Sequence, residues 1–285
     1  MSFTSWLLDV RPANPGELQI TEELGPRGRR RALLGTIGAT ALLLGGLAWV
    51  IRRFQVKGQF EGELWAPFKT WAIWKYLLLG LGQTLKAAGI ALVFTLAFGI
   101  ILAAFRSDSR PVRRVFGTVI TEFLRSCALV LLITFLFFQL PKTPGFRGWT
   151  IGSYALVSVV AGLTFYYSAV MAEVIRSGIR SLPKGQTEAA MAIGLTEGKT
   201  MRLVILPQAL RRALPNIFTQ AATLLKDTSL GVFVTYSELL SRAKIVGEFG
   251  SNQLQSFIVA GGMYITAVAI LTATANRLQR QRRTA

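Results

Sequence analysis

Long apolar runs dominate the pattern of this 285-residue chain. Six runs reach the length of about 20 residues that a helix needs to cross a bilayer. They cover residues 33–51, 77–105, 115–140, 151–174, 213–234 and 257–275. The chain is 52% hydrophobic and only 16% charged, and its mean hydropathy is +0.45. The pattern therefore predicts an all-α integral membrane protein with six transmembrane helices.

The polar segments between these runs differ in character. Residues 1–32 are rich in proline, glycine and charge and predict a cytoplasmic tail, followed by a first transmembrane helix at 33–52. Residues 53–76 contain three tryptophans and a tyrosine, which predicts a periplasmic linker lying along the membrane surface. The largest loop, 177–212, contains helix-forming stretches that Pro183, Gly194, Pro207 and Pro215 should break.

The distribution of Lys and Arg predicts the orientation. If the N-terminus is inside, the inner segments hold 20 of the 32 basic residues and the outer segments hold 9, with 3 inside spans. We therefore expect both termini to be cytoplasmic. The net charge of +18 comes from residues that flank apolar runs, a placement that favours contact with anionic lipid headgroups over nucleic acid.

The residue inventory excludes several chemistries. There is one cysteine, Cys127, and no histidine, so no internal disulfide, no Cys/His metal site and no histidine base is expected. The string GLTEGKT at 194–200 is one residue short of a phosphate-binding P-loop, and no predicted strand precedes it. We expect no cofactor or nucleotide site in this chain.

Charged residues inside predicted spans usually face a protein interior or an aqueous path. Glu122 and Arg125 are three residues apart and can pair on one helix face, so a structural pair is the first interpretation and a substrate pathway the second. Glu173 and Arg176 have the same spacing at the end of the fourth run, where we expect them to brace the following loop.

Lys226 and Asp227 are adjacent in the fifth run, so their side chains should point in different directions. Lys226 follows Ala213 by about 20 Å of helix, which places it past the middle of the membrane, where transport sites often lie. A role in lining the substrate pathway and a purely structural role both remain open.

The 177–212 loop has its own local pattern. A helix is expected near 186–193, with Ala189, Ala190 and Ile193 on one small apolar face and Glu188 near its positive end. Gly194 then permits a sharp turn into a second helix. Leu206-Pro207 should interrupt that second helix. Such a surface suits the groove of a soluble partner.

This loop resembles the EAA loop of ABC importer permeases. Glu188, Ala189, Ala190, Gly194, Leu206 and Pro207 stand at the spacing of that motif, and Val204 occupies its isoleucine position. The resemblance implies that these residues couple the membrane domain to a partner ATPase. The chain itself would then be no enzyme, because ATP would be bound and hydrolysed on separate subunits.

Further stretches at 74–86, 172–186, 207–216 and 224–230 resemble the polar amino acid branch of these permeases. The resemblance covers about residues 74–280 and implies a five-helix permease domain at 77–278, preceded by one extra helix. It also implies a second permease subunit in a heterodimer, two ATPase subunits and an extracytoplasmic substrate-binding protein, at the bacterial cell membrane. It is strongest to actinobacterial glutamate permeases; glutamine, arginine and histidine are the alternative substrates.

One stretch departs from this branch. Many members carry Arg-Gly-Thr-Pro-Leu-Leu-Val-Gln in the third span, where this chain has only the arginine, Arg125, in RSCALVLL. Because the proline is missing, we expect a straighter helix here and a partner subunit that holds the fuller pattern. An exporter or ion-coupled carrier is the competing class of transporter, and a membrane scaffold the competing non-transport class. Neither would explain the loop at 177–212.

Overall fold

The computed structural model describes residues 26–108 and 110–281. The described residues form helices and turns, with no strand among them. They divide into two units, residues 1–60 and residues 61–285, and each is described by itself.

The first unit contains one long helix, α1 (Pro26–Val56). It includes the predicted first span, 33–52, and extends several residues further at each end. Its apolar side chains are exposed within the unit, Leu42 at 79% and Leu43 at 75%, as expected for a helix surrounded by lipid. Of the predicted cytoplasmic tail, residues 1–25 lie outside the described part of the chain.

The second unit begins with a 3-10 segment, η1 (Gly62–Lys69), in the predicted interfacial linker. The elements that follow are α2 (Trp71–Arg106), α3 (Pro111–Ser126), α4 (Leu129–Gln139), η2 (Leu140–Lys142), η3 (Pro144–Phe146), α5 (Ile151–Arg180), α6 (Gly185–Ala192), α7 (Glu197–Thr200), a π-helical turn η4 (Met201–Ile205), α8 (Leu206–Asp227), η5 (Thr228–Val234), α9 (Leu239–Phe249) and α10 (Gln253–Gln281).

Four of the described helices are long and apolar enough to span a membrane: Arg30–Val56 within α1, α2, α5 and Gln253–Ala275 within α10. A fifth span results if the bent pair α3 and α4 is counted as one. The predicted total of six is therefore not confirmed. Helix α8, which holds most of the predicted fifth span, is not among the candidates, and it carries Arg211 and Arg212 near one end and Lys226 and Asp227 at the other.

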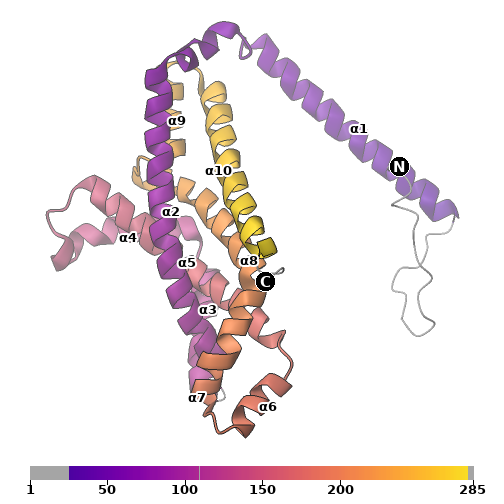
Figure 1. The fold of residues 1–285 in the computed structure, drawn as a ribbon. Coiled ribbons are helices and arrows are strands. Elements are labelled where there is room, and N and C mark those ends of the chain that lie inside the picture. Colours follow the sequence, from indigo (N-terminus) through magenta and orange to yellow (C-terminus); the bar gives the residue numbers. More distant parts are fainter. Residues whose placement is uncertain (1–25, 109, 282–285) are drawn as a thin grey trace. The chain divides into compact units, whose positions relative to one another are not determined.

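Helix α5 forms the centre of the second unit and is the most buried of the four described spans. It packs against α2, α3, α4 and α8. The main apolar core joins Val159 and Leu163 of α5 to Ala87 and Ala91 of α2 and to Leu224 of α8. Small residues on α2 let its backbone approach α5 closely, which is how helices associate in lipid. Figure 1 shows α6 and α7 at one end of this unit and α9 at the other.

The predicted third span is not one straight helix. Helices α3 and α4 meet at 92° around Cys127 and Ala128, whose backbones are extended. The expectation of a straighter helix without proline is therefore wrong, because packing imposes the bend. Ile133 of α4 is fully buried against α5, and a Cβ at Gly162 would lie 2.5 Å from its Cγ1. This close crossing directs α4 sideways out of the bundle (Figure 1).

The long loop also differs from its prediction. Residues 197–227 remain helical throughout, so neither Pro207 nor Pro215 breaks the chain into separate helices. The π-turn η4 ends immediately before Leu206, and its wider hydrogen-bond ring accommodates the absent N–H of Pro207 in the first turn of α8. The predicted interruption at Leu206-Pro207 is replaced by this local widening.

A buried carboxylate that the sequence did not single out organises the far end of the unit. Glu238 has no exposed surface and caps α9 by accepting hydrogen bonds from the N–H groups of Leu240 and Ser241 at 2.8 and 2.6 Å. The Tyr264 hydroxyl donates a third, at 2.6 Å. Burial raises the pKa of the Glu238 carboxyl, and the three hydrogen bonds act in the opposite direction.

Candidate functional site

The break between α3 and α4 opens a cavity of about 360 Å³. Its wall consists of the break itself, one residue of α5, the last residue of α8 and one residue of η5: Arg125, Ser126, Cys127, Ala128, Leu129, Tyr166, Asp227 and Leu230. Two residues predicted as possible pathway residues, Arg125 and Asp227, thus come from distant parts of the sequence to one cavity. The break lets residues 125–129 line the cavity, because a continuous helix would enclose the backbone of these residues in its own hydrogen bonds.

Asp227 is the last residue of α8. The chain continues from it directly into η5, so the backbone stays helical on both sides of Asp227. The hydroxyl of Tyr167 donates a hydrogen bond of 2.6 Å to Asp227 Oδ2, and Tyr167 is itself 98% buried. Lys226 is exposed and does not line the cavity, so the two neighbours do point in different directions.

The cavity therefore presents one guanidinium, one carboxylate, and the polar side chains of Ser126 and Tyr166. The guanidinium of Arg125 is 43% exposed and lies 3.8 Å from Glu122, the pair expected from their spacing. A guanidinium and a carboxylate in one cavity can hold a molecule that carries both a negative and a positive group.

The other predicted pair, Glu173 and Arg176, lies 3.9 Å apart. Arg106, the last residue of α2, connects both pairs: its guanidinium lies 3.3 Å from Glu122 and 3.0 Å from Glu173. Arg106 is 95% buried, and a buried charge needs such partners. A continuous chain of ion pairs thus runs from the cavity wall on α3, through α2, to the part of α5 that precedes the 177–212 loop.

The loop that resembles a coupling motif divides into an exposed and a packed part. Glu188, Ala189, Gly194 and Pro207 are exposed, whereas Ala190 is buried. The predicted common face of Ala189, Ala190 and Ile193 is therefore wrong, because Ala190 faces the protein while Ile193 is 79% exposed. Val204 and Leu206 are half-buried: Val204 packs beside the buried cluster of Leu182, Ile205 and Ala209, and Leu206 packs against the separate core cluster that includes Ile175 of α5 and Ile217 of α8.

Gly194 has a backbone φ of +84°, which glycine adopts without strain. A Cβ added there would meet no atom within 4 Å among the described residues, its two chain neighbours aside. The turn thus needs glycine for its conformation and not for space within the subunit. Its apolar neighbours Met191 and Ile193, together with Leu203 of the π-turn, are exposed and provide an apolar surface beside the turn.

Sequence reasoning missed Arg106 and the adjacent tyrosines Tyr166 and Tyr167 of α5. Arg106 ends an apolar run, so the sequence marks it only as one of several basic residues before α3. Tyr167 and Asp227 are 60 residues apart, so their contact depends on the packing of α5 against α8. Its only signal in the sequence is a tyrosine inside an apolar span, which usually finds a hydrogen-bond partner when buried.

Comparison with known proteins gives consistent results. The glutamate transport system permease protein GluD of Corynebacterium glutamicum is 35% identical over 79% of this chain and 82% of its own length. The probable glutamine ABC transporter permease protein GlnP of Bacillus subtilis is 36% identical over 72% of this chain and 92% of its own. The glutamate/aspartate import permease protein GltK of Escherichia coli is 34% identical over 66% of this chain and 85% of its own length.

Solved structures share the fold. An amino acid ABC transporter crystallised with histidines covers 73% of this chain and 94% of its own, with a TM-score of 0.63 and 23% identity. A chain of the MetNI methionine ABC transporter covers 74% of this chain with 98% of its own length, at a TM-score of 0.63 and 20% identity. Residues 72–284 match the family model described as binding-protein-dependent transport system inner membrane component. These residues include the broken helix, the cavity and the EAA-like loop, and the chain belongs to that family.

Proposed function

We propose that this chain is the permease subunit of an ATP-driven importer for a polar amino acid, and that the substrate is glutamate. The observation that carries the proposal is the cavity at the α3–α4 break, where Arg125 and Asp227 lie in one wall. Every amino acid has an α-carboxylate and an α-ammonium group. Arg125 would bind the first through charge-assisted hydrogen bonds and Asp227 the second.

The choice of glutamate rests on the relatives, because two opposite charges match the α-groups of any amino acid. GluD and GltK are named for glutamate, and GlnP for glutamine. Glutamine is thus the second candidate, followed by arginine and histidine.

The exposed part of the 177–212 loop is the proposed contact with the ATPase. Glu188, Ala189 and Gly194 would enter a groove on that subunit, while the buried Ala190 faces this chain and Val204 and Leu206 pack into the clusters that α8 shares with the end of α5. Pro207 lies exposed at the start of α8, where it supports the π-turn beneath the contact. Closure of two ATPase subunits would then act on α5 and α8 directly. The proposal assigns ATP and its hydrolysis to those subunits and no cofactor to this chain.

The remaining partners follow from the same proposal: a second, non-identical permease subunit and an extracytoplasmic binding protein, assembled in the bacterial cell membrane with both termini of this chain in the cytoplasm. The ion-pair chain through Arg106 would then brace the cavity wall against the inner end of α5. Glu173 and Arg176 keep their expected role at its loop end.

Reconstitution tests the proposal. The chain is expressed with the ATPase, permease and binding protein encoded beside it, and the complex is placed in liposomes with ATP inside the compartment that the loop faces. We expect uptake of labelled glutamate that depends on ATP and on the binding protein. Uptake driven by an ion gradient without ATP would instead show a secondary transporter, and preferential uptake of glutamine would correct the substrate.

A further inference from the structure

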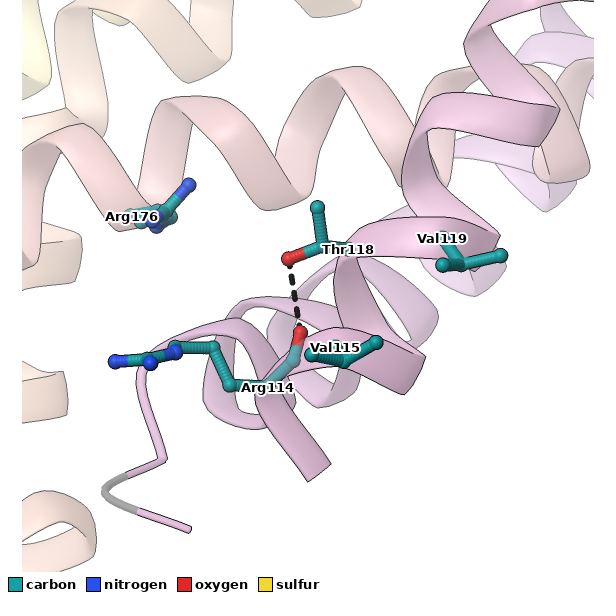
Figure 2. Close-up of a pocket in the computed structure, with 5 residues that line it drawn as sticks. All are labelled: Arg114, Val115, Thr118, Val119 and Arg176. Atoms are coloured by element: carbon teal, nitrogen blue, oxygen red, sulfur yellow. Dashed lines mark hydrogen bonds between the residues drawn. The ribbon is translucent and has the colours of Figure 1, made fainter. Parts of the chain in front are cut away.

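A second cavity, of about 230 Å³, lies between the start of α3 and the inner end of α5. Five residues line it: Arg114, Val115, Thr118 and Val119 of α3, and Arg176 of α5. It shares no lining residue with the cavity at the helix break. In Figure 2 both guanidinium groups lie on the left of the view, while the two valines extend to the right along α3. The cavity thus has two guanidinium groups at one side, while its lining surface is almost entirely apolar.

The cationic side carries uncompensated charge. Arg114 has no carboxylate within 4.0 Å among the residues that the structure describes. Arg176 lies 3.9 Å from Glu173, but that carboxylate is closer to Arg106, at 3.0 Å. Arg106 also contacts Glu122, so four arginines in this region (Arg106, Arg114, Arg125 and Arg176) face two glutamates. The excess of positive charge lies at the two arginines of the cavity.

The apolar side continues along α3 as an exposed stripe. Val115 is 59% exposed and Val119 61% exposed, and Phe116 and Phe123 continue the same surface at 58% and 68%. In a membrane protein such a stripe faces acyl chains. Arg114 lies in the first turn of α3 and Arg176 one turn before the end of α5, near helix ends, where headgroups are located. A phosphate beside two arginines with an apolar tail along α3 matches both sides of the cavity.

We propose that this cavity binds an anionic phospholipid, with the headgroup phosphate between Arg114 and Arg176 and one acyl chain along Val115 and Val119. Basic pockets between transmembrane helices on the cytoplasmic side recognise such headgroups through charge, while the tail adds apolar contact. The site is independent of the amino acid that the transporter carries.

The test uses the full chain, purified and analysed by native mass spectrometry after exchange into mixed phosphatidylglycerol and phosphatidylcholine with identical acyl chains. Phosphatidylglycerol should be retained preferentially. Arg114→Gln should retain it about fivefold less, the factor that one basic residue near an anionic headgroup contributes. Arg110→Gln is the matched control, because Arg110 is an exposed arginine at the start of the same helix and outside the cavity; it should retain wild-type amounts.

A second variant, Val115→Trp, fills the cavity without changing the charge and should displace the lipid as well. Equal retention of both lipids would mean that a non-specific lipid shell surrounds the protein. A loss in Arg110→Gln equal to that in Arg114→Gln would mean that only the overall positive charge matters. Either result would overturn the proposed site. Displacement by millimolar glycerol 3-phosphate would show a free-phosphate site and overturn the assignment to lipid. Retention of phosphatidylglycerol by Val115→Trp at wild-type levels would also overturn it.

Discussion

At the residue scale, Asp227 is the group in the cavity whose surroundings are most specific. Its carboxylate lies at the end of α8, accepts a 2.6 Å hydrogen bond from Tyr167 and faces the cavity that Arg125 also lines. A charged residue in a membrane protein usually has a functional partner, and a cationic group of a substrate would be such a partner for this carboxylate.

Asp227→Asn should therefore weaken substrate uptake while leaving the fold intact, because asparagine keeps the size and can still accept from Tyr167. A hydrogen bond to a charged group contributes about 1.5–3 kcal/mol, so we expect the apparent KM for uptake to rise about 10- to 100-fold. Asp108→Asn is the control, since Asp108 lies in the turn before α3 and pairs with Arg113 at 3.3 Å. Unchanged KM in Asp227→Asn would remove Asp227 from the substrate pathway.

Gly194 gives a second prediction at this scale. Gly194→Ala should cost about 1–2 kcal/mol from the positive φ alone, because nothing in this chain blocks a Cβ. Gly194→Asn should be tolerated better, since asparagine adopts this conformation. Gly194→Asp shares that tolerance but adds a charge at the proposed contact, so it should abolish transport while the protein stays in the membrane.

The measurement compares recruitment of the ATPase with amino acid uptake for each variant. Glu188→Ala should be milder than Gly194→Asp, because it removes a charge at a helix start that contributes about 0.3–1 kcal/mol besides any contact with the partner. If Gly194→Asp recruits the ATPase and transports normally, this loop is not the coupling element.

At the scale of elements, the sequence predicts local features well. The apolar runs locate α2 and α5, and the turn chemistry locates the short helix α6 and the turn at Gly194. The bend between α3 and α4 could not be predicted, because no residue in RSCA requires it. It arises from burial of Leu129 and Ile133 against α5, a contact between distant segments. The same holds for Arg106, whose two partners come from other helices.

The crossing of α4 and α5 can be tested at Gly162. Gly162→Ala places a Cβ 2.5 Å from Ile133 Cγ1 and 3.3 Å from its Cα, so α4 must shift. Overpacking of this kind costs about 1–3 kcal/mol, which should lower the thermal midpoint of the purified protein by several degrees. Gly152→Ala in the same helix meets nothing within 4 Å and should leave the midpoint nearly unchanged. Equal midpoints in the two variants would mean that α4 does not pack here.

The ion-pair chain gives a prediction of its own. Arg106→Gln removes the only charge that contacts both Glu122 and Glu173 among the described residues; because the two glutamate side chains left behind are 53% and 40% exposed, the loss should be about 1–3 kcal/mol, below that of a fully buried pair. Arg113→Gln breaks an exposed pair with Asp108 and should cost less than about 1 kcal/mol. Thermal unfolding of both variants in the same detergent separates the two cases. If Arg106→Gln lowers the free energy of unfolding no more than Arg113→Gln does, water reaches the ion pairs of Arg106 and screens them.

At the scale of the whole molecule, the sequence and the structure give complementary information on topology. The distribution of basic residues, 20 against 9, distinguishes an inner from an outer set of loops. The structure of the second unit places α6 at the end opposite α9 (Figure 1). Together they predict that the loop of α6 is cytoplasmic and that the turn after α9 is periplasmic.

Single-cysteine labelling tests this topology in intact cells, because Cys127 is the only cysteine and Cys127→Ser provides a cysteine-free background. In that background, Ser251→Cys, at an exposed position between α9 and α10, should react with a membrane-impermeant maleimide added outside. Glu188→Cys, at an exposed position of α6, should react only after the membrane is opened. Reaction of Glu188→Cys in intact cells would reverse the orientation, since an ATPase in the cytoplasm could not then reach the loop. Reaction of both positions from the same side would mean that the second unit does not cross the membrane as the positive-inside pattern requires.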